Sequence, residues 1–102
     1  MQVISVEENR IDAAVALAFK DAMRRETDGG PATVLLNLQS VEFIDSSGLG
    51  AIVATMKHLA PDRRLVLAGL TPAVDKVFRL TRMDSVFSLH STLDDAMVAE
   101  RV

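Results

Sequence analysis

The sequence predicts an α/β fold with a small, mostly parallel four-stranded sheet and about four helices. Short, β-branched apolar runs alternate along the chain with longer segments whose apolar residues recur at helical spacing. Strands that alternate with helices in this way form parallel sheets with right-handed crossovers. A length of 102 residues suits one domain, so we expect residues 1–102 to fold as a single domain.

Four segments are predicted to be strands. Gln2–Val6 alternates polar and apolar residues and is rich in β-branched side chains, which is typical of a short strand. Thr33–Leu38 and Leu65–Ala68 are apolar runs of the kind found in buried parallel strands. Val86–Leu89 is predicted to be a last, short strand.

The first two predicted helices lie between these strands. Asp12 is placed to cap a helix that runs to about Thr27, where the glycines and proline of residues 28–31 end it. The second helix is expected from about Ser46 to Leu59. Its apolar stripe consists of Leu49, Ile52, Val53, Met56 and Leu59.

Two further helices are predicted in the second half of the chain. Thr71 and Pro72 form a strong helix start, because a capping hydroxyl precedes a proline at the first helical position. Ser91 or Thr92 is expected to cap the final helix, with aspartates at 94–95 in its first turn. The apolar face of the third helix is predicted to hold Val74, Val77, Phe78 and Leu80.

Composition excludes several classes of function. The formal net charge of −3 and the absence of Trp and Tyr argue against a surface for nucleic acid or anionic membrane. The chain has no Cys, which excludes disulfides, thiolate metal sites and cysteine nucleophiles. It shows no signal peptide and no apolar run near the ~20 residues of a membrane span. We therefore expect a cytoplasmic protein without a cofactor or metal.

The segment at residues 45–50 is unusual for a helix start. Asp45, Ser46 and Ser47 are all good N-caps, although a helix needs only one. Gly48 and Gly50 follow in the first turns, where each glycine costs about 1 kcal/mol relative to alanine in a helix interior. These glycines make sense if something approaches the backbone closely or if the helix end must adjust.

A serine hydroxyl at a helix start is well placed to carry a phosphate, because free N–H groups and the helix dipole favour negative charge there. A capped helix with small residues packed on a neighbour explains the same residues equally well. Enzyme patterns fit less well, since neither a P-loop lysine nor a Gly-x-Ser-x-Gly elbow is present. His58 and His90 have no metal-ligand spacing and are expected at the solvated surface, and Asp84-Ser85 is expected in a turn.

The residues from Phe43 to Gly50 resemble the signature of the STAS domain, in its bacterial anti-sigma factor antagonist branch. The resemblance covers nearly the whole chain. It extends to the segments 10–12, 36–38, 70–74, 77–80 and 91–97 and to Phe87. Two features depart from the family. An extra N-terminal strand usual in the family is expected to be missing or very short, and Asn9 stands where the family often has a glycine that allows positive φ.

The resemblance implies a STAS-type fold and a regulatory protein that is not an enzyme. Such proteins bind an anti-sigma factor that is also an ATP-dependent serine kinase, and Ser46 matches the serine that the kinase modifies. A metal-dependent serine phosphatase would reverse the modification. The residues implied in partner or kinase binding are Asp12, Asp45, Ser47, Gly48, Leu49, Gly50 and Lys57. A monomer or weak dimer is expected. The alternative is an accessory STAS subunit of a transporter or of another signalling complex.

Overall fold

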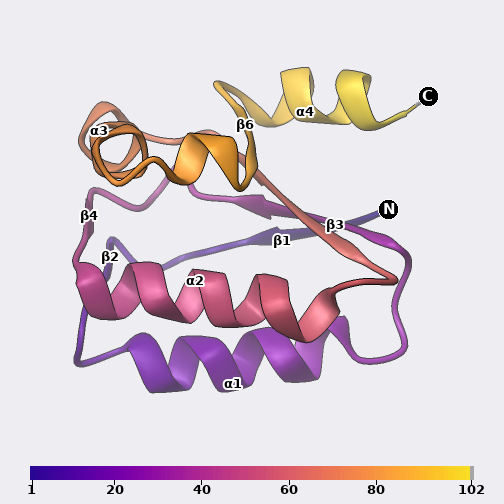
Figure 1. The fold of residues 1–102 in the computed structure, drawn as a ribbon, viewed down its shortest axis with the longest axis horizontal. Coiled ribbons are helices and arrows are strands. Elements are labelled where there is room, and N and C mark those ends of the chain that lie inside the picture. Colours follow the sequence, from indigo (N-terminus) through magenta and orange to yellow (C-terminus); the bar gives the residue numbers. More distant parts are fainter. Residues whose placement is uncertain (102) are drawn as a thin grey trace.

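The structure, a computed structural model, describes residues 1–101, and Figure 1 shows its arrangement. Within these residues the chain alternates strands and helices as expected. The elements are β1 (Gln2–Ser5), β2 (Arg10–Ile11), α1 (Ala16–Thr27), β3 (Thr33–Asn37), β4 (Phe43–Ile44), α2 (Ser46–Leu59), β5 (Arg64–Ala68), α3 (Pro72–Leu80), the 3-10 turn η1 (Met83–Ser85), β6 (Ser88–His90) and α4 (Leu93–Glu100).

The main sheet has four parallel strands in the order β1-β3-β5-β6. Because this order follows the chain in one direction, right-handed crossovers place successive helices on the same face. Accordingly α1 and α2 lie side by side across one face, and α4 lies on the opposite side (Figure 1). α3 packs near β4 at the end of the sheet. The predicted α/β class and four-stranded parallel sheet are confirmed.

The two faces of the sheet carry separate apolar clusters. Leu36 and Leu67 point toward α1 and α2, where they join Ile52 of α2 and Phe78 of α3 in the larger cluster. The opposite face is a smaller cluster in which Leu35, Val66 and Ala68 pack with Ala96 of α4. β3 and β5 are therefore buried on both sides, which explains why their sequences are almost continuously apolar.

A second, smaller sheet was not predicted. β2 and β4 form a parallel pair in which Arg10 aligns with Phe43 and Ile11 aligns with Ile44. The N–H of Glu42 also donates to the carbonyl of Asn9 at 2.7 Å. Asn9 does not adopt the expected positive φ, since Arg82 is the one non-glycine residue with positive φ among residues 1–101. The pairing brings the loop before α1 against the start of α2.

The prediction that Asp12 caps α1 is wrong. The helix begins at Ala16, and its N-cap, Val15, makes no side-chain cap hydrogen bond. The Asp12 carbonyl accepts from the amides of Val15 and Ala16 at 3.1 and 2.8 Å. Its side chain accepts from the N–H of Ala14 at 3.0 Å. Asp12 therefore stabilises a tight turn that must be completed before the helix can start.

Two predictions in the second half of the chain need correction. Leu80 was assigned to the apolar face of α3 but is 73% exposed, because it lies roughly 240° around the helix from buried Val74. The last strand is β6 at Ser88–His90, so it begins later than the expected Val86. The predicted turn at Asp84-Ser85 is confirmed as part of η1.

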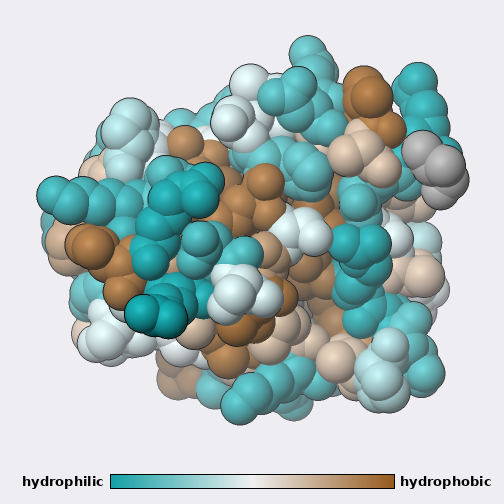
Figure 2. Space-filling view, turned by 45° about the horizontal axis from the view of Figure 1, so that its top comes forward, coloured by the Kyte–Doolittle hydropathy of each residue, from teal (hydrophilic) through white to brown (hydrophobic). Residues whose placement is uncertain are grey.

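The two histidines differ in their surroundings. His58 is exposed, as predicted, whereas His90 is half-buried and its Nε2 has no hydrogen-bond partner within residues 1–101. His90 lines a hollow of about 300 Å³ between α3 and β6. The face that carries α3 and α4 shows apolar side chains in the middle of the surface between polar ones (Figure 2). The expectation of two solvated histidines therefore holds for His58 alone.

Candidate functional site

The start of α2 is fixed by Asp45. This residue follows β4 in an extended conformation, with φ of −108° and ψ of −173°. Its Oδ1 accepts from the N–H of Gly48 at 2.9 Å, and its carbonyl accepts from Leu49 at 2.9 Å. Asp45 is thus the N-cap, which leaves Ser46 and Ser47 as the first helical residues.

The same carboxylate joins α2 to the loop before α1. Oδ2 of Asp45 accepts from the N–H of Ala13 at 3.3 Å. The N–H of Asp45 in turn donates to the carbonyl of Ile11 at 3.4 Å. Both oxygens of Asp45 therefore bind backbone amides from two different segments. This side chain holds the loop after β2 and the start of α2 together.

Asp12 lies beside Asp45. Its Oδ1 accepts from Ala14, the residue directly after the Ala13 that donates to Asp45. Oδ2 of Asp12 forms an ion pair with Nε of Arg10 at 2.7 Å. The Arg10 guanidinium also lies 5.0 Å from the centre of the Phe43 ring. Two carboxylates and one guanidinium are thus gathered where the loop after β2 meets the start of α2.

Ser46 presents a free hydroxyl at this point. The residue is exposed, and its side chain has no hydrogen-bond partner within residues 1–101. The amides of Ser46 and Ser47 precede the first intrahelical donors, so they belong to the orphan N–H groups that a helix start leaves open. A negatively charged group on this hydroxyl would lie near those amides and the positive end of the helix dipole.

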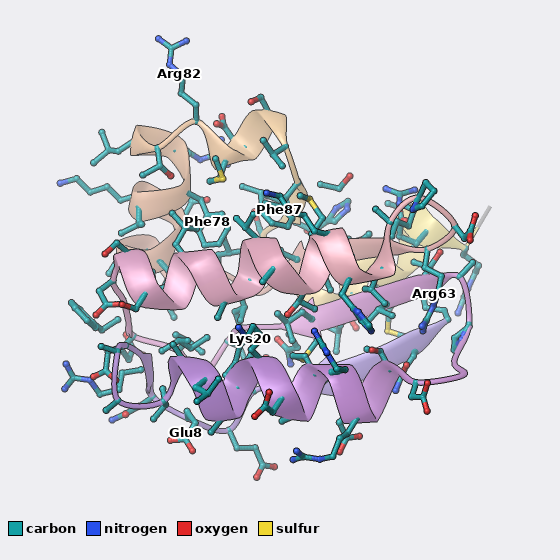
Figure 3. The ribbon with its side chains drawn as sticks, turned by 60° about the horizontal axis from the view of Figure 1, so that its bottom comes forward. Glu8, Lys20, Arg63, Phe78, Arg82 and Phe87 are labelled. Atoms are coloured by element: carbon teal, nitrogen blue, oxygen red, sulfur yellow. The ribbon has the colours of Figure 1, made fainter. Side chains whose placement is uncertain are left out.

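A shallow groove lies next to Ser46 between α1 and α2. It has a volume of about 320 Å³. Its lining residues are Ala13, Ala16, Leu17, Lys20, Ser47, Gly50, Ala51 and Ala54. Leu17 is 67% exposed, and the side chain of Lys20 lies between the two helices (Figure 3). The groove therefore combines small and apolar side chains with the polar groups of Lys20 and Ser47, directly after Ser46.

The two glycines of the segment serve different purposes. A Cβ on Gly48 would overlap the carbonyl oxygen of Ile11 and lie 2.9 Å from Cγ1 of Ile44. The close approach inferred from sequence is therefore made by the chain's own β2. A Cβ on Gly50 would meet nothing within 4 Å, and Gly50 is exposed. Packing within the described residues gives no reason for a glycine there.

Two residues implied by the resemblance lie apart from this cluster. Leu49 is half-buried and packs on the larger apolar cluster. Lys57 is exposed in the last turn of α2, about 16 Å beyond Ser46 at a rise of ~1.5 Å per residue. It shares the exposed stripe of Ser46 and Gly50, since residues eleven apart return to nearly the same side of a helix. Lys57 can contact the partner of Ser46 only if that partner covers the length of α2.

Within residues 1–101 no group of three or more His, Asp or Glu side chains is placed to hold a metal ion. None of the helices in that range combines the length and hydropathy that crossing a bilayer requires.

Comparison with known families identifies the domain. The family model of the STAS domain matches residues 3–96. The chain belongs to the STAS domain family. The Anti-sigma-F factor antagonist RsfB of Mycobacterium tuberculosis is 28% identical over 91 residues, which cover 89% of this chain and 75% of RsfB.

Solved structures of anti-sigma factor antagonists superpose on this STAS domain. An anti-sigma factor antagonist from Mycobacterium paratuberculosis superposes with a TM-score of 0.87 at 33% identity, covering 98% of this chain and 85% of that one. SpoIIAA in its unphosphorylated form superposes with a TM-score of 0.75 at 25% identity, covering 97% of this chain and 86% of SpoIIAA. SpoIIAA of Bacillus in its phosphorylated form superposes with a TM-score of 0.67 at 23% identity, covering 95% of this chain and 87% of that one. This last comparison shows a similar fold.

Sequence reasoning missed Arg10 in this STAS domain. Its role depends on the register that sets Arg10 beside Phe43 and on the short turn that returns Asp12 toward it. The one signal in the sequence was the order Arg-Ile-Asp, which places a cation and a carboxylate on the same side of an extended segment. Without the pairing of β2 and β4, nothing connects that pattern with Ser46.

Proposed function

We propose that this STAS domain is an anti-sigma factor antagonist that is switched off by phosphorylation of Ser46. In its unmodified form it binds an anti-sigma factor and so frees a sigma factor for transcription. The proposal rests on one observation above all: an exposed, unbonded serine hydroxyl stands at the start of α2. The names of RsfB and of the Mycobacterium paratuberculosis protein support the antagonist class.

The proposed modification is a phosphoryl transfer to the side chain of Ser46. The hydroxyl oxygen attacks the γ-phosphorus of ATP, the bond from that phosphorus to ADP breaks, and the hydroxyl proton passes to a base of the kinase. The kinase is the anti-sigma factor itself. A metal-dependent serine phosphatase hydrolyses the new ester and returns the free hydroxyl with inorganic phosphate. The domain itself is a substrate in this cycle and catalyses no step.

The switch works by charge at an interface. A partner that covers Ser46 must desolvate its hydroxyl, which is small and neutral. Phosphate adds about −1.5 to −2 charges at pH 7 and strong acceptor oxygens. These charges would lie beside the carboxylates of Asp12 and Asp45, so the local surface becomes strongly acidic. An unpaired interfacial charge is costly, and a loss of about 4 kcal/mol lowers affinity roughly a thousandfold.

The fold is expected to tolerate the modification. Asp45 already satisfies the Gly48 amide and holds the loop before α1, so Ser46 contributes no hydrogen bond that phosphate would break. The free amides of the first turn favour a negative group. Phosphorylation therefore changes the surface while the packing beneath it stays the same. Because ATP, the kinase and sigma factors share one compartment, we place this cycle in the cytoplasm.

Mapping the phosphate tests the proposal directly. Incubate the protein with its cognate anti-sigma factor kinase and ATP, and locate the modification by mass spectrometry of peptides. We expect phosphate on Ser46 and none on Ser46→Ala. Ser47 lies one residue further along α2, and Ser85 lies in η1, where its hydroxyl already donates to the carbonyl of Arg82 at 2.7 Å. Phosphate mainly on Ser47 or Ser85 would overturn the assignment.

A further inference from the structure

Among residues 1–101, no strand is paired to the outer edge of β1 in the main sheet. β1 pairs with β3 on one side and is the first strand of the sheet order. Val6 donates its N–H to the carbonyl of Asn37 at 3.0 Å, so the backbone of Val6 faces β3. Backbone groups of a parallel strand alternate in direction from residue to residue. The N–H and C=O groups of Val3 and Ser5 therefore point to the open side.

β1 is a short edge strand of four residues, but it carries neither a charge nor a proline against pairing with another chain. Natural edge strands carry charged side chains, proline or a bulge, which discourage pairing with another chain. The β1 sequence Gln-Val-Ile-Ser contains no charge and no proline, and Val3 is 40% exposed. The side chains of Gln2 and Ser5 are hydrogen-bonded to Glu26 and Asn37 within the domain, and neither covers the edge. The strand is a ready template for an added strand.

A hollow of about 650 Å³ runs beside this edge, between β1 and α1. Its apolar lining comes from Ile4, Val6, Val15, Phe19, Ala22 and Met23. Its rim is acidic, since Glu7, Glu8 and Glu26 line it together with a single cation, Arg25. Glu8 lies on the side of α1 away from α2 (Figure 3). None of the residues that line this hollow also lines the groove beside Ser47.

We propose that this β1 edge binds an extended peptide segment of another protein, in which apolar residues are flanked at both ends by Lys or Arg. The segment adds a strand by hydrogen-bonding to the outward backbone groups of Val3 and Ser5. Because side chains alternate along a strand, every second one enters the hollow, which favours apolar residues there. Basic residues at the two ends of the segment complement the acidic side chains, because Glu26 contacts Gln2 at the start of β1 and Glu7 and Glu8 follow its end. The surface is separate from the proposed phosphorylation switch.

Charge argues against a second copy of this chain as the occupant. An antiparallel β1–β1 pair would bring residues 1–9 of one copy along the same residues of the other. That segment contains Glu7 and Glu8 but neither Lys nor Arg. A second copy would therefore add acidic side chains to an acidic rim, whereas a basic segment neutralises it.

Binding of synthetic peptides tests the proposal. The probe is a fluorescein-labelled peptide of about seven residues that alternates Val and Thr between a Lys at each end, and its control carries Glu in place of every Lys. Fluorescence anisotropy gives the affinities, and amide hydrogen exchange by NMR gives the site. We expect saturable binding of the basic peptide, at least tenfold weaker binding of the acidic one, and slower exchange at Val3 and Ser5 in the complex. Equal binding of both peptides, or no saturation at about 1 mM, would overturn the proposal.

Two pairs of variants locate the contact. Val3→Pro removes an outward N–H without removing a bond to β3, and Val3→Thr is its control. Glu8→Lys changes the rim, and Asp62→Lys makes the same charge change in the exposed turn after α2. We expect Val3→Pro to abolish binding and Glu8→Lys to weaken it at least threefold, while both controls bind like the parent.

The comparison of Glu8→Lys with Asp62→Lys tests the proposed site even if Val3→Pro fails to fold. Equal affinity for Glu8→Lys and Asp62→Lys would contradict the assignment of the acidic rim. Exchange at Val3 and Ser5 that slows with protein concentration alone, without peptide, would assign the edge to a second copy instead.

Discussion

At the scale of single residues, Asp45 and Gly48 fix the start of α2, while Ser46 makes none of these contacts. Asp45 uses both carboxylate oxygens on backbone amides, and Gly48 lets the helix approach the carbonyl of Ile11. These two residues build the site, and this construction leaves the Ser46 hydroxyl free. The side chains of Asp45 and Asp12 already bind backbone amides within the domain, so a role in structure is enough to explain them. Their contacts with a kinase stay predictions.

The two glycines give a matched prediction at this scale. Gly48→Ala forces a Cβ against backbone and should lower the free energy of unfolding by about 1–3 kcal/mol. Gly50→Ala meets nothing and should raise it by up to about 1 kcal/mol, because alanine is the better helix former. Urea denaturation of both variants measures the difference. An unaffected Gly48→Ala would contradict the close packing of β2 against α2. A destabilised Gly50→Ala would contradict the open surroundings of Gly50.

Gly50 is also informative about binding. A more stable Gly50→Ala that binds the anti-sigma factor poorly would mean that the partner approaches the helix backbone at this point. Unchanged binding would leave the glycine without a structural or functional explanation.

At the scale of elements, α2 has one face on the core and one face exposed. Val53 is half-buried and packs on the larger apolar cluster, so Val53→Asp would bury an unpaired charge. We expect this variant to be largely unfolded at room temperature. Lys57→Ala changes an exposed residue of the same helix and should stay within about 0.5 kcal/mol of the parent. Thermal melting followed by circular dichroism compares the two, and a Val53→Asp that melts like the parent would contradict this placement of the helix face.

Elements with strong periodicity could be predicted from the sequence, and short or context-dependent ones could not. The predicted second helix, from about Ser46 to Leu59, coincides with α2, because its apolar spacing and cap act locally. β2 and β4 have two residues each and exist only through pairing across the fold, so no local pattern reveals them. Asp12 is a residue type that often caps helices, but here it forms a turn. Its side chain binds the amide of Ala14 and its carbonyl binds the amide of Ala16, where the helix begins, and the sequence does not show these contacts.

The same division applies to the candidate site. The segment 45–50 could be singled out because an over-supplied cap followed by glycines is a local anomaly, and the resemblance to the STAS signature then pointed to Ser46 within it. The ion pair of Arg10 with Asp12 is local, but the link from Asp45 to Ala13 joins residues 32 positions apart and could not be read from either segment alone. A site of this kind is found from sequence at its serine and completed only by its tertiary neighbours.

At the scale of the whole molecule, the fold separates three surfaces. The start of α2 carries the proposed switch, and α4 covers the opposite face of the sheet (Figure 1). The acidic hollow lies between β1 and α1. A partner at the β1 edge and a partner at Ser46 could therefore bind at the same time, because their surfaces share no lining residue.

The central claim is that phosphate on Ser46 lowers affinity for the anti-sigma factor without changing the fold. Isothermal titration calorimetry on the unmodified protein, Ser46→Ala, Ser46→Asp and the phosphorylated protein measures this directly, with circular dichroism as the control for folding. We expect Ser46→Ala to bind like the unmodified protein and the phosphorylated protein to bind roughly a thousandfold more weakly. Ser46→Asp carries a single charge, so its affinity should fall between them. Equal affinity of Ser46→Ala and the phosphorylated protein would contradict the switch, and would favour a docking subunit of a transporter or of another signalling complex.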